Sequence, residues 1–147
     1  MRYLLAALSL VLAAFSARAD IVDIDNAELA RLTAAGVPVI DVRTAQEWQE
    51  TGIVPGSRLI TFFDEQGRAN PAAWLEKAKA VAKPGEPVAV ICRSGNRTKA
   101  VSRFLSEQAG YAKVYNVKAG ILGWTREGRP VVPAAPALAA CRAERTC

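Results

Sequence analysis

Short apolar runs rich in β-branched residues alternate with helix signals along this chain of 147 residues. Expected strands lie at 37–42, 58–62, 88–91 and 114–117. Helix signals lie at 25–36, 44–50, 70–81, 97–110 and 118–124. Strands that alternate with helices pair in parallel through right-handed crossovers. The pattern therefore predicts one α/β domain with a mainly parallel sheet and helices on both faces.

The first 19 residues have the features of a secretory signal peptide. Arg2 is followed by an apolar run from Tyr3 to Phe15, and Ala17-Arg18-Ala19 resembles a cleavage site. The apolar run is short for a bilayer span, although a short membrane anchor stays open as an alternative. We expect residues 1–19 to be a signal peptide, with no stable membrane anchor. Export implies an oxidising compartment, the periplasm if the host is Gram-negative.

The remaining chain divides into a domain at 20–133 and a segment at 134–147 rich in Ala and Pro. The second segment contains two cysteines and lacks a convincing periodicity, so we expect a tail that is partly ordered at best.

The chain contains no histidine and three cysteines. It therefore cannot form a Ser-His-Asp triad, a Cys-His dyad, a His-containing metal site or a four-cysteine zinc site. We expect no metal and no organic cofactor. The formal net charge is +5, and because Arg2 and Arg18 lie in the leader, residues 20–147 carry +3. This charge is too small and dispersed to indicate nucleic-acid binding, but it is compatible with a small anionic substrate.

Cys92 directly follows the strongly apolar strand expected at 88–91. Open parallel α/β sheets bind ligands beyond the carboxyl ends of their strands, so this position suits a reactive group. A polar loop with Arg93 and Arg97 follows, and a helix begins at its end. Loop amides, the helix dipole and the two arginines all favour a thiolate over a thiol. A thiolate nucleophile needs no histidine base, and a buried structural cysteine is the alternative.

Six segments together give the chain a resemblance to single-domain members of the rhodanese family, over about residues 22–133. They are Asp41-Val42-Arg43, Glu47-Trp48, Gly52-Ile53-Val54-Pro55-Gly56, Cys92-Arg93-Ser94-Gly95-Asn96-Arg97, Gly120-Ile121-Leu122-Gly123-Trp124 and Gly128-Arg129-Pro130. The chain departs from the family pattern at Ile53, where a histidine is usual. We expect that position to be structural.

The resemblance implies a three-layer α/β/α fold with a sheet of about five strands. It also implies sulfur transfer: Cys92 would take a sulfane sulfur from a donor such as thiosulfate, become a persulfide, and pass the sulfur to cyanide or a thiol. A protein acceptor is a further possible partner. The expected donor-binding residues are Arg93, Ser94, Gly95, Asn96, Arg97 and Thr98, with Asp41 and Arg43 supporting the loop. Arg97 could instead pair with a carboxylate such as Asp41, and Thr98 could be a helix cap.

Two other functions stay open. Phosphatases and arsenate reductases of related architecture use Cys-x5-Arg, whereas this chain has Cys-x4-Arg with Thr98 at the sixth position after Cys92. The shorter loop suits a sulfur atom better than a tetrahedral oxyanion. A persulfide or redox carrier, or a partner-binding module without thiosulfate activity, is the other alternative.

Cys141 and Cys147 lie six residues apart in the C-terminal segment. A disulfide between them suits an oxidising compartment. The alternative is a mobile tail thiol that resolves or accepts sulfur from Cys92.

Overall fold

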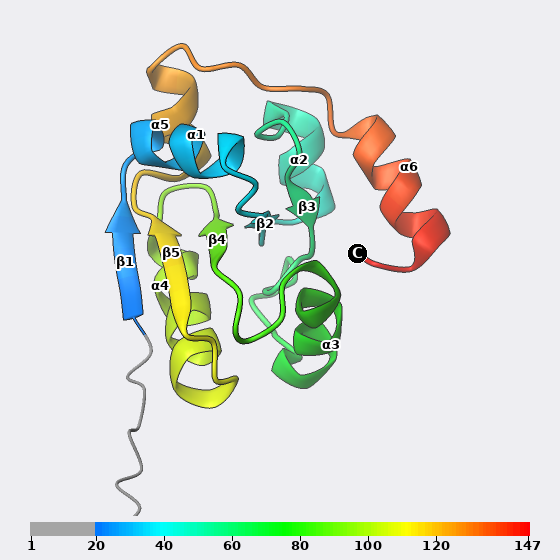
Figure 1. Cartoon of the computed structure of the whole chain (residues 1–147). Helices are drawn as coiled ribbons and strands as arrows, with labels where there is room; N and C mark the ends of the chain where they lie inside the picture. Colours follow the sequence, from blue (N-terminus) through cyan, green and yellow to red (C-terminus); the bar gives the residue numbers. More distant parts are fainter. Residues whose placement is uncertain (1–19) are drawn as a thin grey trace, which may run out of the picture.

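The computed structural model describes residues 20–147 (Figure 1). The signal peptide expected at 1–19 lies outside the described residues and stays a prediction. None of the helices within residues 20–147 combines the length and the apolar character that crossing a bilayer requires.

The core of the domain is a five-stranded sheet in which every pairing is parallel. Its strands are β1 (Asp20–Ile24), β2 (Val39–Asp41), β3 (Arg58–Leu59), β4 (Val88–Ile91) and β5 (Lys113–Val117), in the spatial order β1-β5-β4-β2-β3. The α/β class and the parallel sheet predicted from the alternating pattern are thus confirmed.

The central strand β4 shows why helices cover both faces of the sheet, because all four of its side chains are buried. Val88 and Val90 face one core cluster, with helices α3 (Pro71–Val81), α4 (Asn96–Arg103) and the π-helical turn η1 (Phe104–Gln108). Ala89 and Ile91 face the other cluster, with α1 (Asn26–Ala34) and α5 (Gly120–Arg126). Alternation along a strand produces this division, which places the two clusters and their helices on opposite faces of the sheet.

Local sequence signals account for several helix starts. Asp25 accepts a hydrogen bond from the Glu28 amide and begins α1, and Asn70 caps α3 in the same way, with Pro71 in the first turn. Thr44 and Glu47 form a reciprocal capping box at the start of α2 (Ala45–Thr51).

The sequence pattern did not predict strand β1, and it predicted a longer strand β3 than the structure has. Strand β1 lies at the edge of the sheet and buries only Ile24, so its sequence carries no continuous apolar run. The run at 58–62 forms only two residues of paired strand. Beyond them the chain bends away, although Ile60 and Phe62 stay buried against α3.

The expectation of a poorly ordered tail at 134–147 is wrong. Helix α6 (Ala135–Glu144) forms there and packs beside β3 and α2 (Figure 1). Leu138 and Cys141 are its buried side chains, and they join a cluster with Trp48 and Leu59. The helix buries only these two side chains, which is why its sequence shows no periodic stripe.

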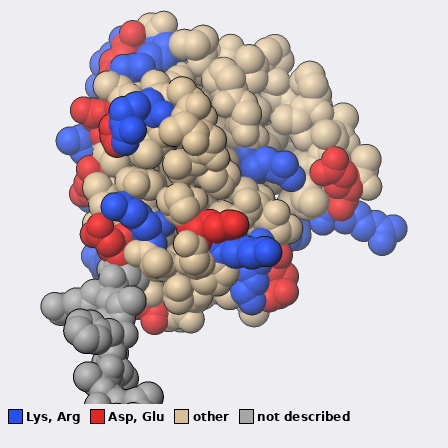
Figure 2. All heavy atoms as spheres, viewed as in Figure 1, with Lys and Arg blue, Asp and Glu red and all other residues tan. Residues whose placement is uncertain are grey.

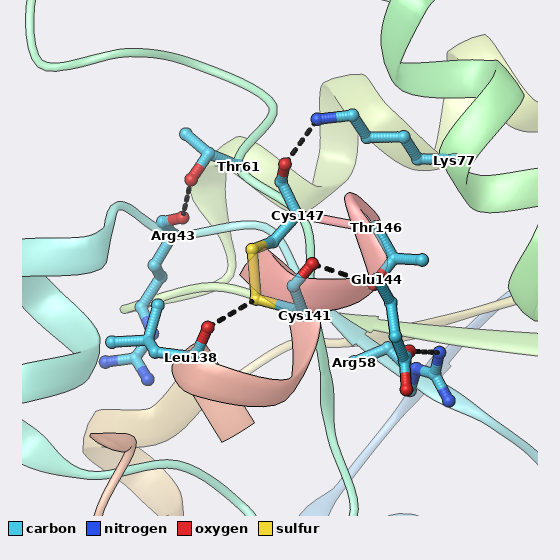
Figure 3. The surroundings of a disulfide bond; sticks show 9 residues. All are labelled: Arg43, Arg58, Thr61, Lys77, Leu138, Cys141, Glu144, Thr146 and Cys147. Carbon is cyan, nitrogen blue, oxygen red and sulfur yellow. Dashed lines mark hydrogen bonds and ion pairs between the residues drawn. A yellow bond between two sulfur atoms is a disulfide. The ribbon is translucent and has the colours of Figure 1, made fainter. Parts of the chain in front are cut away.

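The end of α6 is joined to the last residue by a disulfide between Cys141 and Cys147 (Figure 3). The Cys141 carbonyl accepts a hydrogen bond from the Thr146 amide at 2.9 Å. Lys77 on α3 donates to the backbone oxygen of Cys147. These contacts attach the C-terminal segment to the domain, so neither tail cysteine is a mobile thiol in this structure.

Candidate functional site

Backbone hydrogen bonds from the start of α5 fix the loop that follows β4. The Ile121 amide donates to the Cys92 carbonyl at 2.9 Å, and the Leu122 amide donates to the Arg93 carbonyl at 3.1 Å. Gly120 permits this approach, since a Cβ built there would lie 2.4 Å from the Arg93 oxygen. The motif at 120–124 therefore serves to fix the backbone of the loop that carries Cys92.

Cys92 is the only free cysteine among the described residues, and it is 1% exposed. Its Sγ accepts a hydrogen bond from the Gly95 amide at 3.1 Å and lies 3.6 Å from Oγ1 of Thr98. The Thr98 hydroxyl also donates to the Gly95 carbonyl at 3.1 Å. A backbone amide at the start of α4 that points at a sulfur atom stabilises negative charge on it.

Gly95 is the residue that lets the loop close around the sulfur. It has a φ of +89°, and a Cβ built on it would lie 2.1 Å from the Lys118 carbonyl oxygen. No other residue type fits this position without moving the backbone.

Arg97 does not pair with Asp41, the partner suggested from the sequence. It forms a two-pronged ion pair with Glu47 on α2, with distances of 2.8 and 2.5 Å. Burial alone would raise the pKa of Glu47. The hydrogen bonds from Arg97 and the Thr44 amide outweigh it and lower that pKa from 4.5 to about 2. The same hydrogen bond raises the pKa of Arg97 above its usual value.

Asp41 forms an ion pair with Arg43, and both side chains are fully buried. The two carboxylate oxygens of Asp41 accept from the Arg43 guanidinium at 2.7 to 3.1 Å. The guanidinium also donates to the Thr51 hydroxyl at 2.6 Å and the Gly52 carbonyl at 2.9 Å. A buried charge pair needs such additional partners. This pair ties the end of β2 to the end of α2, the helix that presents Glu47 to the loop.

The other residues expected to bind the donor differ in exposure. Arg93, Ser94 and Asn96 are exposed, whereas Gly95 and Thr98 are buried. Glu47 contacts the Cys92 loop through Arg97, but the sequence did not predict this role. The capping motif at 44–47 already accounted for a glutamate at this position. Glu47 serves both roles, since Oε2 accepts from the Thr44 amide and from Arg97.

The usual histidine position of the family pattern is taken by Ile53. Its side chain is 1% exposed and packs in the cluster that contains Trp48 and Leu138. It lies in the core and outside the Cys92 loop.

The described residues show neither a strongly basic surface on the face drawn in Figure 2 nor a cluster of metal-ligating side chains. On the face shown in Figure 2, Lys and Arg side chains are interspersed with Asp and Glu, without a continuous basic tract. Within residues 20–147, no group of three or more Cys, Asp or Glu side chains is arranged to hold a metal ion.

Residues 25–127 match the Rhodanese-like domain family. "Thiosulfate sulfurtransferase 18" of Arabidopsis thaliana is 29% identical over 117 residues, covering 76% of this chain and 84% of that protein. A "Sulfurtransferase" of Allochromatium vinosum is 30% identical over 112 residues, covering 75% and 94%. The structure of a rhodanese-related protein from Thermoplasma volcanium aligns with a TM-score of 0.57 at 32% identity, covering 76% and 97%.

Proposed function

Because the chain belongs to the rhodanese-like family, whose similar members are named as sulfurtransferases, we propose that it transfers sulfane sulfur through a persulfide on Cys92. The observation that carries this proposal is the hydrogen bond from the Gly95 amide to Cys92 Sγ, at the start of α4. It stabilises a sulfur anion without any histidine, which the chain lacks.

The first displacement loads the cysteine. The Cys92 thiolate attacks the outer sulfur of a donor such as thiosulfate, and a new S–S bond forms. The S–S bond of thiosulfate breaks, and its electron pair leaves with sulfite. Arg93 is an exposed residue of the loop and supplies positive charge for an anionic donor.

The second displacement returns the enzyme to its starting state. A thiolate or cyanide attacks the outer sulfur of the persulfide, and the electron pair of the broken S–S bond returns to Cys92 Sγ. The Gly95 amide donates to that same sulfur, so it stabilises the leaving thiolate. No external oxidant or reductant is consumed.

Arg97 favours this reaction over phosphate-ester hydrolysis. In a phosphatase loop, the arginine must offer its guanidinium to the oxyanion. Here Arg97 gives both of its terminal nitrogens to Glu47. It therefore acts as a positioning residue that fixes the loop to α2.

The test is turnover with thiosulfate and cyanide. We expect sulfite and thiocyanate in equal amounts from the native protein, and neither product from Cys92→Ser. An aryl phosphate should give no product with either protein. Hydrolysis of the aryl phosphate that is lost in Cys92→Ser would replace the proposal with phosphatase activity.

Export forms a second part of the proposal. The signal-like features of residues 1–19 and the cysteine pair at 141 and 147 suit an oxidising compartment such as the periplasm. Cell fractionation with the leader intact tests it: we expect a shortened protein that begins at Asp20 in the periplasmic fraction.

A further inference from the structure

An open hollow lies against the outer side of the Cys92 loop, and its charged lining is mostly acidic. Arg93 and Arg97 of the loop border it, together with the carboxylates of Glu47, Glu50, Asp64 and Glu65. Four carboxylates face two guanidinium groups, so the lining has a formal charge of −2 at neutral pH. Residues 20–147 as a whole carry +3. The hollow beside the loop that carries Cys92 is thus acidic, although residues 20–147 as a whole are basic.

The ion pairs decide which charges face an incoming molecule. Arg97 and Glu47 neutralise each other, and Asp64 pairs with Arg68, which lies outside the lining, at 2.8 Å. Within the described residues, Glu50 and Glu65 have no ion-pair partner and are exposed. Arg93 is the one remaining unpaired cation of the lining. Two free carboxylates therefore outweigh one free guanidinium.

Resting on the proposed function, we infer that the sulfur acceptor of this site is a thiol on a positively charged molecule. A cationic thiol gains attraction from Glu50 and Glu65, and an anionic thiol is repelled by them. Arg93 lies on the loop itself, next to Cys92, where it can still meet the anionic sulfur of the donor. The two halves of the reaction thus use different charges of the same hollow.

The step that this selectivity governs is the second displacement. The acceptor thiol releases its proton to water, and its thiolate forms a bond to the outer sulfur of the persulfide. The S–S bond to Cys92 breaks, and its electron pair returns to Cys92 Sγ. The acceptor leaves as a persulfide.

The experiment measures this step alone. Cys92 is loaded with inorganic polysulfide, desalted and checked by intact mass, and the loss of the added sulfur is timed with two small thiols. Cysteamine carries a positive charge and 3-mercaptopropionate a negative one. Because the two thiols also differ in intrinsic reactivity, each rate is compared with that of the same thiol acting on Glu50→Gln/Glu65→Gln.

We expect the double variant to lower the cysteamine rate about threefold and to raise the 3-mercaptopropionate rate about threefold at low salt. This magnitude is what Coulomb's law and low-salt screening give in water when two unit charges each act over an assumed distance of about 10 Å. At about 0.5 M salt both effects should nearly vanish, because the Debye length falls to about 4 Å.

The matched control is Glu76→Gln/Glu107→Gln, which removes the same charge from exposed positions on α3 and η1 outside the hollow. It should leave both rates unchanged. Equal effects in the control, or parallel changes for the two thiols, would overturn the inference while the sulfurtransferase chemistry stands. Absence of sulfur on Cys92 after polysulfide treatment would overturn the proposed function and this inference with it.

The two sources of a cationic thiol are distinguished in a second arm. Peptides with one cysteine flanked by lysines or by glutamates replace the small thiols. For the native protein, the rate ratio of the lysine peptide to the glutamate peptide is compared with the rate ratio of cysteamine to 3-mercaptopropionate. A larger ratio for the peptides points to a basic protein segment as the acceptor, and equal ratios point to a small aminothiol.

Discussion

Replacing Glu47 by Gln should destabilise the domain in a pH-dependent way. Gln keeps the size of the side chain and can still accept a hydrogen bond from the Thr44 amide, but it removes the negative charge that pairs with Arg97. The Arg97 side chain is only 28% exposed, so it would lose its ion pair in a partly desolvated place.

The magnitude follows from the pKa of Glu47, which is lowered from 4.5 to about 2 in the folded protein. A shift of this size corresponds to about 3 kcal/mol. The Glu47 side chain is 20% exposed, and solvent screening reduces the expected effect to about 1–2 kcal/mol. We therefore expect Glu47→Gln to lower the free energy of unfolding by about 1–2 kcal/mol at pH 7.

The sign of the pH dependence is fixed by the direction of the shift. A carboxyl group with a lowered pKa contributes stability above its unfolded pKa and loses it as the pH falls through the folded pKa. The difference between the native protein and Glu47→Gln should hold down to about pH 4.5 and shrink toward zero near pH 2.

Urea unfolding at pH 7, 5, 4 and 3 measures this difference. Glu50→Gln is the matched control, because Glu50 lies on the same helix, is exposed and has no ion pair among the described residues. It should change stability little. A Glu47→Gln variant as stable as the native protein at pH 7, or a difference that stays constant down to pH 3, would refute the role assigned to this ion pair.

Three further variants test other parts of the structure. Gly95→Ala should cost more than about 2 kcal/mol and abolish sulfur loading, because a Cβ would meet the Lys118 carbonyl; native-like urea unfolding would contradict this. Thr98→Val should slow loading about fivefold by removing the hydroxyl beside Sγ, with a stability cost of about 1 kcal/mol; an unchanged loading rate would exclude the hydroxyl. Cys141→Ser/Cys147→Ser should lower stability by about 2 kcal/mol, the chain-entropy value for a sequence separation of 6; an unchanged urea midpoint would show that the packing of α6 suffices.

The sequence predicts the centre of the fold better than its edges. Strand β4 is a continuous apolar run because it is buried on both faces, and the place of Cys92 at its end follows directly. Strand β1 is an edge strand, and only one of its five side chains is buried, so the same signal is absent.

Tertiary contacts decide the features that the sequence leaves open. Helix α6 depends on docking two side chains onto Trp48 and Leu59, and its Ala-rich sequence does not show that contact. Arg97 has several acidic residues as possible partners, and only the packing of α2 against the loop selects Glu47 over Asp41. A reciprocal cap explains Glu47 from local sequence alone, which conceals its second role.

The decisive measurement is the intact mass of the reduced, desalted protein after incubation with thiosulfate, beside Cys92→Ser treated in the same way. We expect the native protein alone to gain one sulfur atom, and cyanide to remove it. An unchanged mass would exclude thiosulfate as the donor. If inorganic polysulfide also left the mass unchanged, or if Cys92→Ser gained the same sulfur, a persulfide on Cys92 would be ruled out as the basis of this protein's function.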